Sequence, residues 1–288
     1  MLIKIFLVVL TCAPFSRVWA RSERAWQPLQ TRDYVLDFSL AAGAYAAYVL
    51  VPRQSGDVGH SNFFDDAGRS AFRLSSAGSR HDAHVWSNIF LTGAIAIPVA
   101  FDTGLVLVRD KDPRSAARIG NINAQAFGLT AILTGTTKAL VGRERPYATA
   151  CRRNPGSDPG CQSVDDDESV KSFYSGHSVY AFTAAGLTCL HHTELRLYGD
   201  SRDTWACGTA IGLASAVAIA RVAADKHYVT DVSSAALIGL FSGYVFPRWL
   251  HSTEVAPEVR ASSPIHNAGQ WLPVAGADSI GLTYLNSF

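Results

Sequence analysis

The sequence predicts an all-α protein, a bundle of about six core helices followed by a short strand-like C-terminal tail. Long stretches rich in Ala, Leu, Ile and Val recur along the chain, and each exceeds the usual length of a strand. Prolines lie near the ends of several stretches, and polar loops separate them. The alternation of apolar and small residues that is typical of strands is found near the C-terminus.

Six stretches are predicted to form the core helices, and they share an apolar composition with small residues on repeated faces. They cover residues 33–51, 84–108, 121–142, 176–193, 204–223 and 231–249. Pro52, Pro146 and Pro247 lie near three of the predicted helix ends. Proline suits such positions because it lacks an amide hydrogen and disfavours a helical conformation in the residue before it.

Two long polar segments connect these helices. Residues 53–83 are predicted to form an irregular loop or to contain a short surface helix around residues 67–74. Residues 147–173 are predicted to form a loop that carries the acidic run Asp165-Asp166-Asp167-Glu168. Consecutive carboxylates on a loop are more often solvated than bound to a metal, so we expect no metal site there.

The chain is expected to divide into three segments. Residues 1–20 resemble a secretory signal peptide, since one lysine precedes a short apolar run and Val18-Trp19-Ala20 matches the cleavage pattern. That run is shorter than the ~20 apolar residues that cross a bilayer. Residues 21–250 then form the helical domain. Residues 251–288 form the tail, in which a β-hairpin turning near Gly276-Ala277-Asp278 is expected.

The cysteines agree with export of the mature chain. Cys151 and Cys161 flank a segment rich in Pro, Gly and Asp, which suits a disulfide in an oxidising compartment. Cys189 and Cys207 lie near the end of one predicted helix and the start of the next. A second disulfide and two buried thiols fit this second pair equally well. We therefore expect the protein in the periplasm or cell envelope.

Charge and hydropathy limit the partners. The formal net charge is +1, so nothing global attracts nucleic acid, and no nucleic-acid partner is expected. Residues 89–108 carry a single charge and are the best candidate for a membrane span. Six spans after a cleaved signal would, however, place the basic residues described below on the cytoplasmic side. We therefore expect a compact periplasmic bundle that is able to lie against a membrane, and the oligomeric state stays open.

Lys138 and Arg145 are the first candidate site residues. They are seven residues apart, which is about two helical turns, so both project from one face of a helix. Two cations on one face of an otherwise apolar helix require an anion, because buried charges are rarely left unpaired. For this pair taken alone, an ordinary basic helix end, where cations offset the helix dipole, is the better explanation.

Ser175, Gly176 and His177 lie where the predicted helix 176–193 begins. Serine is a favoured N-cap, glycine lets a ligand approach the backbone, and the free amide groups of a first turn bind anions. His177 is placed to protonate a leaving group. A capping segment with a surface histidine is the simpler alternative.

Arg221, His227 and Asp231 form the third candidate group. His227 and Asp231 are four residues apart, so we expect the carboxylate to reach one imidazole nitrogen and to fix the tautomer of the ring. The planar guanidinium of Arg221 suits phosphate oxygens. Asp225 and Lys226, between them, are expected to be solvated.

In combination and order, these three groups resemble the type 2 phosphatidic acid phosphatase family, which includes bacterial acid phosphatases and vanadium haloperoxidases. The family pattern is K-x6-R-P, then P-S-G-H, then S-R-x5-H-x3-D. This sequence contains Lys138 to Arg145-Pro146, Tyr174-Ser175-Gly176-His177, and Ala220-Arg221 to His227 and Asp231. Tyr174 replaces proline and Ala220 replaces serine, both outside the groups expected to react. The resemblance implies a helical bundle of this family's type, with residues 21–250 as its catalytic domain.

The resemblance also implies a mechanism. His227 would attack phosphorus and form a phosphohistidine intermediate, with Asp231 orienting the ring. His177 would protonate the departing oxygen and then activate water. The non-bridging oxygens would be held by Lys138, Arg145, Ser175, Gly176 and Arg221. No metal or cofactor is implied, and vanadate is expected to act as an inhibitor.

The substrate is less closely defined than the reaction. Apolar helices and export favour a phosphomonoester or diphosphate of a lipid, and a soluble phosphate ester remains an alternative. A second alternative is a vanadium-dependent haloperoxidase, which would use vanadate as a cofactor in the same pocket. A third is a non-catalytic phosphate- or lipid-binding envelope protein, although binding alone would need only the cations.

Overall fold

The computed structural model describes residues 24–26, 29–51, 61–156, 161, 166–254, 270–276 and 279–285. The signal peptide predicted for residues 1–20 lies outside these residues. The chain divides into two compact units, of which the larger is Gln27–Ser252. The smaller combines Met1–Trp26 with Thr253–Phe288. Each unit is described by itself.

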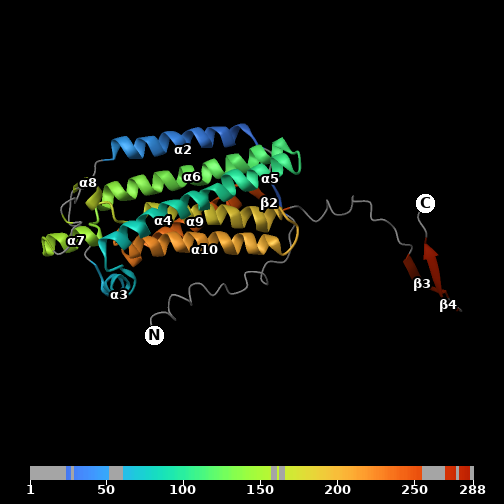
Figure 1. Ribbon diagram of the computed structural model, residues 1–288. Coiled ribbons are helices and arrows are strands. Elements are labelled where there is room, and N and C mark those ends of the chain that lie inside the picture. Colours follow the sequence, from blue (N-terminus) through green and yellow to red (C-terminus); the bar gives the residue numbers. More distant parts are fainter. Residues whose placement is uncertain are drawn as a thin grey trace. The chain divides into compact units, whose positions relative to one another are not determined.

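Within the described residues, the larger unit consists of helical passes that run side by side, as Figure 1 shows. The passes are α2 (Thr31–Leu50), α4–η1–α5 (Ala77–Ala96, Ile97–Asp102, Thr103–Val108), α6 (Pro113–Val141), α9–η3 (Gly176–Leu190, His191–Leu195), α10 (Arg202–Ala223) and α11–η4–α12 (Val229–Leu240, Phe241–Val245, Phe246–His251). The η segments are π-helical. Short helices α3 (Phe63–Phe72), α7 (Pro146–Arg153) and α8 (Asp166–Ser169) lie between passes. The predicted all-α bundle is confirmed.

Two helices begin earlier than predicted because polar caps precede their apolar cores. The side chain of Ser76 accepts a hydrogen bond from the amide of Ser79, so α4 starts at Ala77. Asp112 accepts hydrogen bonds from two amides of the first turn of α6, which Pro113 opens. These side chains satisfy amide groups that have no partner within the helix.

Prolines end fewer helices than predicted. The third pass ends at Gly142, whose φ of 58° is left-handed, and Pro146 begins the new helix α7. The prediction of a continuous loop over 147–173 is therefore wrong, since a proline at the first helical position needs no amide hydrogen. Pro247 also lies inside a helical pass, where π-helical η4 precedes α12. The wider π turn accommodates the missing donor.

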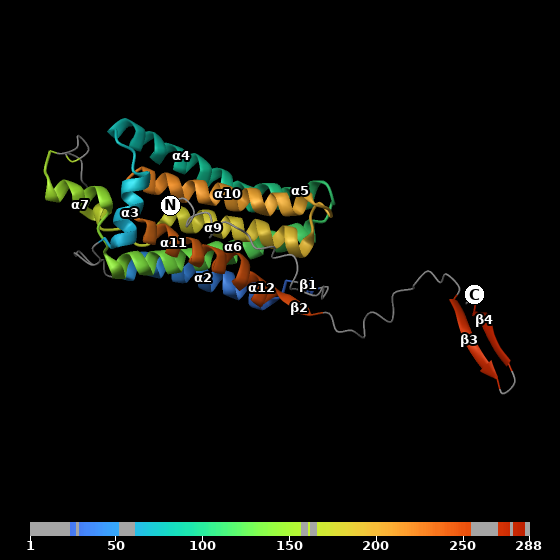
Figure 2. The ribbon, with the colours of Figure 1, turned by 90° about the horizontal axis from the view of Figure 1, so that it is seen from below.

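Helix α9 forms the centre of the bundle. It lies between α10 and α6 in both views (Figures 1 and 2), and it also packs against α4 and α11. Every residue from Ser178 to Leu190 except Tyr180 is buried. Its many small residues let neighbours approach closely. The ideal Cβ position of Gly243 lies 2.1 Å from the carbonyl oxygen of Thr183, so only glycine fits there.

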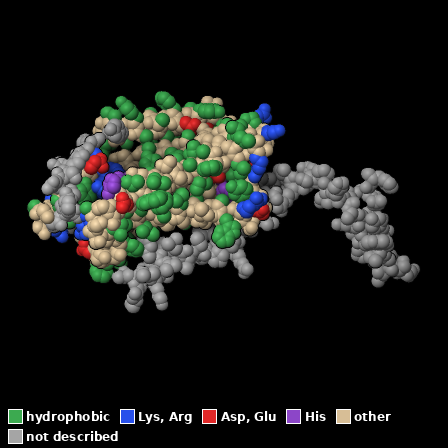
Figure 3. All heavy atoms as spheres, in the orientation of Figure 1, with side chains coloured by type: hydrophobic (Ala, Val, Ile, Leu, Met, Phe, Trp, Pro, Cys, Tyr) green, Lys and Arg blue, Asp and Glu red, His purple; other side chains and the backbone are tan. Residues whose placement is uncertain are grey.

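Apolar side chains also cover much of the outer surface of the bundle (Figure 3). Helix α2 packs on α6 through small residues, and its other face exposes Tyr34, Phe38 and Tyr45. Three described segments are long and apolar enough to cross a membrane by length and composition: Ala77–Val108, Arg202–Ala223 and Val229–His251.

The smaller unit contains short strands. β1 (Arg24–Trp26) pairs with β2 (Ser252–Glu254). In the tail, β3 (Gln270–Gly276) and β4 (Ser279–Leu285) pair antiparallel, with Gly276 opposite Ser279. The two strands of the hairpin expected in the tail are therefore present, and residues 277–278 between them lie outside the described residues.

A glycine-to-alanine pair tests the close packing around α9. Gly243→Ala should lower the free energy of unfolding by about 1–3 kcal/mol, because the new methyl group meets the backbone of Thr183. Gly212→Ala is the control, since no atom lies within 4 Å of its ideal Cβ on α10. It should raise stability by up to about 1 kcal/mol. Unfolding followed by circular dichroism measures both, and equal effects would contradict the packing argument.

Candidate active site

The candidate site residues gather at one end of the bundle, because four passes end or begin there. Helix α6 ends at Val141, α9 begins at Gly176, α10 ends at Ala223 and α11 begins at Val229. Each of the three predicted groups lies at or beside one of these ends. In Figures 1 and 2 this end also carries α3 and α7, and in Figure 3 basic and histidine side chains are visible there.

His227 is buried, and its partner differs from the predicted one. Its Nδ1 donates a hydrogen bond to the carbonyl oxygen of Ser172 at 2.8 Å. The distance from Nδ1 to Oδ2 of Asp231 is 3.7 Å, too long for a direct hydrogen bond. Asp231 instead accepts hydrogen bonds from the Ser172 hydroxyl at 2.6 Å and from the Tyr228 amide at 2.9 Å. Asp231 therefore influences the ring through Ser172, whose hydroxyl it binds and whose carbonyl oxygen accepts from the ring. Asp231 also caps α11 through the Tyr228 amide.

Asp231 belongs to a buried ion network that the sequence does not reveal. Arg143 donates to Asp231 at 2.6 Å and to Asp65 of α3 at 2.7 Å. Asp65 also accepts hydrogen bonds from the amide and hydroxyl of Thr230. The guanidinium lies 4.3 Å from the centroid of the Tyr228 ring. Arg143 thus bridges two carboxylates that are distant in sequence, and it joins α3 to the start of α11.

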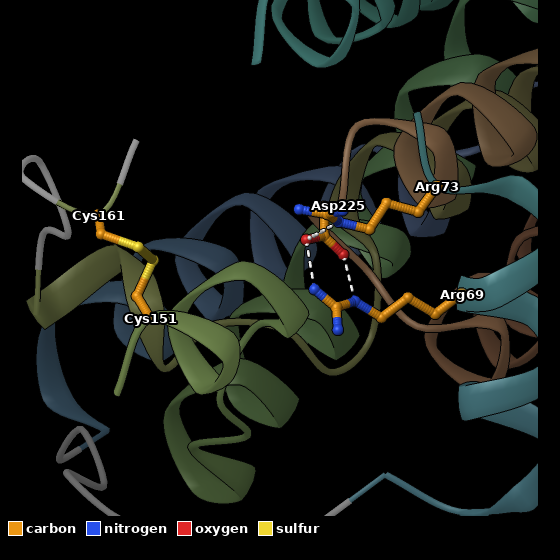
Figure 4. The surroundings of a disulfide bond; sticks show 5 residues. All are labelled: Arg69, Arg73, Cys151, Cys161 and Asp225. Atoms are coloured by element: carbon orange, nitrogen blue, oxygen red, sulfur yellow. Dashed lines mark hydrogen bonds and ion pairs between the residues drawn. A yellow bond between two sulfur atoms is a disulfide. The ribbon is translucent and has the colours of Figure 1, made fainter. Parts of the chain in front are cut away.

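A second ion pair holds the segment that carries His227. Asp225 is buried and has a φ of 58°. Arg69 binds it through two hydrogen bonds of 2.6 and 2.7 Å, and Arg73 adds a third at 2.8 Å (Figure 4). The expectation that Asp225 is solvated is therefore wrong. Arg69 of α3 and Arg73, which directly follows α3, lie more than 150 positions away, so the local sequence gives no sign of them.

Lys138 lies at the N-terminus of α9. Its Nζ is 3.3 Å from the ideal Cβ position of Gly176, so a larger residue there would crowd the ammonium group. Ser175 is the N-cap of α9, since its hydroxyl oxygen accepts from the amide and the hydroxyl of Ser178. The ammonium group of Lys138 therefore lies next to the first amide groups of α9.

Arg145 is buried but already has an anionic partner. Its Nε donates to the carbonyl oxygen of Glu168, and its Nη2 donates to the Glu168 carboxylate at 3.0 Å. Glu168 also pairs with Lys171. Glu168, the last residue of the acidic run that was expected to be solvated, is therefore paired with two cations. About half of the Glu168 side chain is exposed, so a phosphate group would compete with an accessible carboxylate for Arg145.

Arg221 and His177 both contact helix α4, which the sequence does not implicate. Arg221 Nη1 lies 2.6 Å from Nδ1 of His84 and 3.3 Å from the Ser87 hydroxyl. His177 Nε2 lies 2.7 Å from Oδ1 of Asn88. His84 and Asn88 are four residues apart, so they lie on one helical face. In the sequence they look like ordinary polar residues of an amphipathic segment.

The cations perturb the histidines strongly. Burial and the charges of Arg145, Arg221 and Lys138 hold the pKa of His227 well below its usual value. Burial and the nearby cations, with Arg221 first, lower the pKa of His177 to about 3. Burial and Arg145 also lower the pKa of Lys138 to about 8. Both histidines are neutral near pH 7, in a pocket where positive charge exceeds negative charge.

Two disulfides lie in different parts of the bundle. Cys151 of α7 is joined to Cys161, next to the site (Figure 4). The pair that the sequence leaves open, Cys189 and Cys207, is also joined and links α9 to α10. Among the described residues, no group of three or more His, Cys, Asp or Glu is placed to hold a metal ion.

Comparisons with known proteins give a family model and a similar solved structure. A family model described as the PAP2 superfamily matches residues 122–254, a range that contains all three groups. A solved structure, a transmembrane PAP2 type phosphatidylglycerolphosphate phosphatase from Bacillus subtilis, is similar at 20% identity with a TM-score of 0.47. That match covers 76% of this chain and 96% of the other.

Two arginine variants test the buried network. Arg143→Ala should lower the free energy of unfolding by about 3–5 kcal/mol, because it leaves Asp65 and Asp231 buried without their cation. Arg152→Ala is the matched control, since its ion pair with Glu144 is 60% exposed on the arginine side. Its cost should stay below about 1 kcal/mol. Similar costs in urea unfolding would show that the Arg143 bridge is not a structural support.

Proposed function

We propose that this chain, which belongs to the PAP2 superfamily, hydrolyses phosphate esters of lipids through a phosphohistidine intermediate. It is a PAP2-type phosphatase by its family match and its set of motif residues. Its partner is a phosphorylated lipid, and membrane contact fits the apolar outer surface of the bundle. The mechanism and the substrate class are argued below.

The tautomer of His227 carries the proposal. A carbonyl oxygen can only accept a hydrogen bond, so Nδ1 must carry the proton that it shares with Ser172. In the neutral ring, Nε2 then keeps its lone pair. Because the pKa of His227 is held far below its usual value, the ring stays neutral and nucleophilic at neutral pH. Such a ring is prepared to attack phosphorus.

The proposed reaction has two displacements. The charge of the bound phosphate dianion favours the protonated form of His177, which takes up a proton from solvent before the reaction. His227 Nε2 forms a bond to phosphorus while the bond from phosphorus to the ester oxygen breaks, and the protonated His177 gives a proton to that oxygen. A water oxygen then attacks phosphorus, His177 takes its proton, and the bond from phosphorus to Nε2 breaks. Phosphate leaves, and both histidines return to their starting state.

The cations supply the electrostatic part of the proposed reaction. Arg221 contacts the neutral side chains of His84 and Ser87, and Lys138 lies beside Gly176, so a phosphate dianion would meet positive charge that Glu168 offsets only in part. Arg145 would exchange Glu168 for a substrate oxygen. The first amides of α9, at Gly176, add a neutral anion site, with Ser175 as the cap beside it. Positive charge fixed in advance stabilises the transition state of phosphoryl transfer.

We propose further that the reaction needs no metal or cofactor and that vanadate inhibits it. The haloperoxidase alternative is separated by assay. Bromide oxidation with peroxide and vanadate would support it, whereas phosphate release without either supports the phosphatase. Tight phosphate binding without turnover on any substrate would favour a binding protein.

We also propose that the chain is exported and that both ends of the bundle lie in oxidising surroundings. The two disulfides support this, because one lies beside the site and the other joins the far end of α9 to the start of α10. Disulfides persist in oxidising compartments and are rare in the cytosol. A passage of the bundle across a membrane with a reducing cytosol on one side would expose one disulfide to reduction.

The function is tested with a substrate panel on the mature protein. Phosphatidate, phosphatidylglycerol phosphate, an isoprenyl diphosphate and p-nitrophenyl phosphate are assayed with and without detergent. Lipid phosphates should be hydrolysed fastest, and His227→Ala should reduce phosphate release to background because the nucleophile is lost. His81→Ala, an exposed histidine on α4, should keep the wild-type rate. Phosphate release by His227→Ala at the wild-type rate would defeat the assignment.

The location is tested through the cysteines. After thiol alkylation of intact cells, mass spectrometry should recover Cys151 linked to Cys161 and Cys189 linked to Cys207, with no alkylated cysteine among the four. Cys189→Ser should leave Cys207 open to alkylation, which confirms that the reagent reaches that end. Recovery of either wild-type pair as alkylated thiols would contradict the proposed location.

A further inference from the structure

Two polar residues of α4 lie against the two groups that would handle the substrate. His84 contacts Arg221, with 2.6 Å between Nδ1 and Nη1, and Asn88 contacts His177, with 2.7 Å between Oδ1 and Nε2. The rings of His84 and His177 are 6.3 Å apart between centroids. One face of α4 thus contacts both a phosphate-holding cation and the proton donor.

We propose that His84 and Asn88 are positioning residues, which aim Arg221 and His177 at the phosphate without neutralising either. This inference rests on the proposed function, since it assigns roles within the same pocket. Neither residue belongs to the three motifs, and helix α4 lies outside the matched range 122–254.

The contact with Arg221 requires a neutral His84. A guanidinium only donates hydrogen bonds, so Nδ1 of His84 must accept and cannot carry a proton. Burial and the charge of Arg221 lower the pKa of His84 to about 4, in agreement with a neutral ring at pH 7. A carboxylate at this position would hold the arginine equally well but would cancel its charge.

The other atoms of Arg221 indicate where that charge is directed. Arg221 is buried, and its Nε has no hydrogen-bond partner among the described residues. A buried donor without a partner is costly, and a bound phosphate oxygen would satisfy it. His84 therefore fixes one edge of the guanidinium while another donor stays available for the ligand.

The contact with His177 fixes the ring in a similar way. Oδ1 of Asn88 accepts from Nε2, so a proton exchanged with substrate or water is carried by Nδ1. An amide has no net charge, so it orients the ring without adding to the basicity that a carboxylate would give. This suits a group that must release its proton readily.

Phosphate binding tests the role of His84 without reference to turnover. Orthophosphate affinity is measured by calorimetry on the full mature chain. His84→Ala should weaken binding about tenfold or more, because Arg221 loses its support. His84→Asn, which keeps an acceptor near the position of Nδ1, should stay within about threefold of wild type. His84→Asp should bind more weakly than His84→Ala, because the new carboxylate cancels the charge of Arg221. His81→Ala is the control on the same helix.

The role of Asn88 is tested by the titration of His177 in histidine-labelled protein, followed by NMR. Asn88→Asp should raise the pKa of His177 by about 1 unit or more, because a carboxylate stabilises the charged ring. Asn88→Leu should not raise it. Thr92→Ala, one turn further along α4, should leave it unchanged.

The outcomes separate this inference from the proposed function. Phosphate binding that depends on His84, without turnover, would support the inference and overturn the phosphatase. Turnover with phosphate binding that is equal in wild type, His84→Ala and His84→Asp would overturn the role of His84. An unchanged His177 pKa in Asn88→Asp would overturn that of Asn88. A wild-type chain that neither binds nor hydrolyses phosphate would overturn both proposals.

Discussion

The bridge that Arg143 makes between Asp65 and Asp231 is the contact on which the rest of the site depends. The single guanidinium of Arg143 is shared by two carboxylates, so it offsets only part of the charge of Asp231. What Asp231 provides is position: it holds the Ser172 hydroxyl, and the carbonyl of the same residue holds the imidazole. His227, the proposed nucleophile, is therefore oriented through a chain of hydrogen bonds that ends in a buried ion pair. The free-energy cost of burying these charged groups is offset only while every hydrogen bond of that chain is present.

Beside this ion network, the candidate site holds three cations, Lys138, Arg145 and Arg221, which share the carboxylate of Glu168. Arg221 contacts the neutral side chains of His84 and Ser87, and the carboxylate that pairs with Arg145 belongs to the half-exposed Glu168. Burial and the resulting positive potential lower the pKa of both His177 and His227, so these histidines are neutral near pH 7. A bound phosphate dianion would reverse that effect at His177, because a negative charge favours the protonated ring. The proton donor would then be charged chiefly when there is a substrate to receive its proton.

The sequence predicted the helical passes and the gathering of the motifs well, because both depend on local patterns. Apolar composition marks each pass, and helix ends determine which residues meet. It failed where the deciding partner is distant. Asp225 looked solvated because Arg69 and Arg73 lie on another helix. The direct bond between His227 and Asp231 was expected from spacing alone, yet a backbone carbonyl, which no sequence pattern identifies, takes that place.

The site residues also serve as the ends of the helices that carry them, and this explains why the motifs are so short in sequence. Ser175 caps α9 with the hydroxyl that the phosphate would approach, and Asp231 caps α11 through the Tyr228 amide. Each cap fixes the direction of a helix and the position of a reacting group at once. The two departures from the family pattern affect neither cap. Tyr174 is buried, with its hydroxyl 3.3 Å from that of Thr134, so it replaces proline by filling core volume. The chemistry tolerates such a change because the caps, and not the residue before them, determine where the reacting atoms lie.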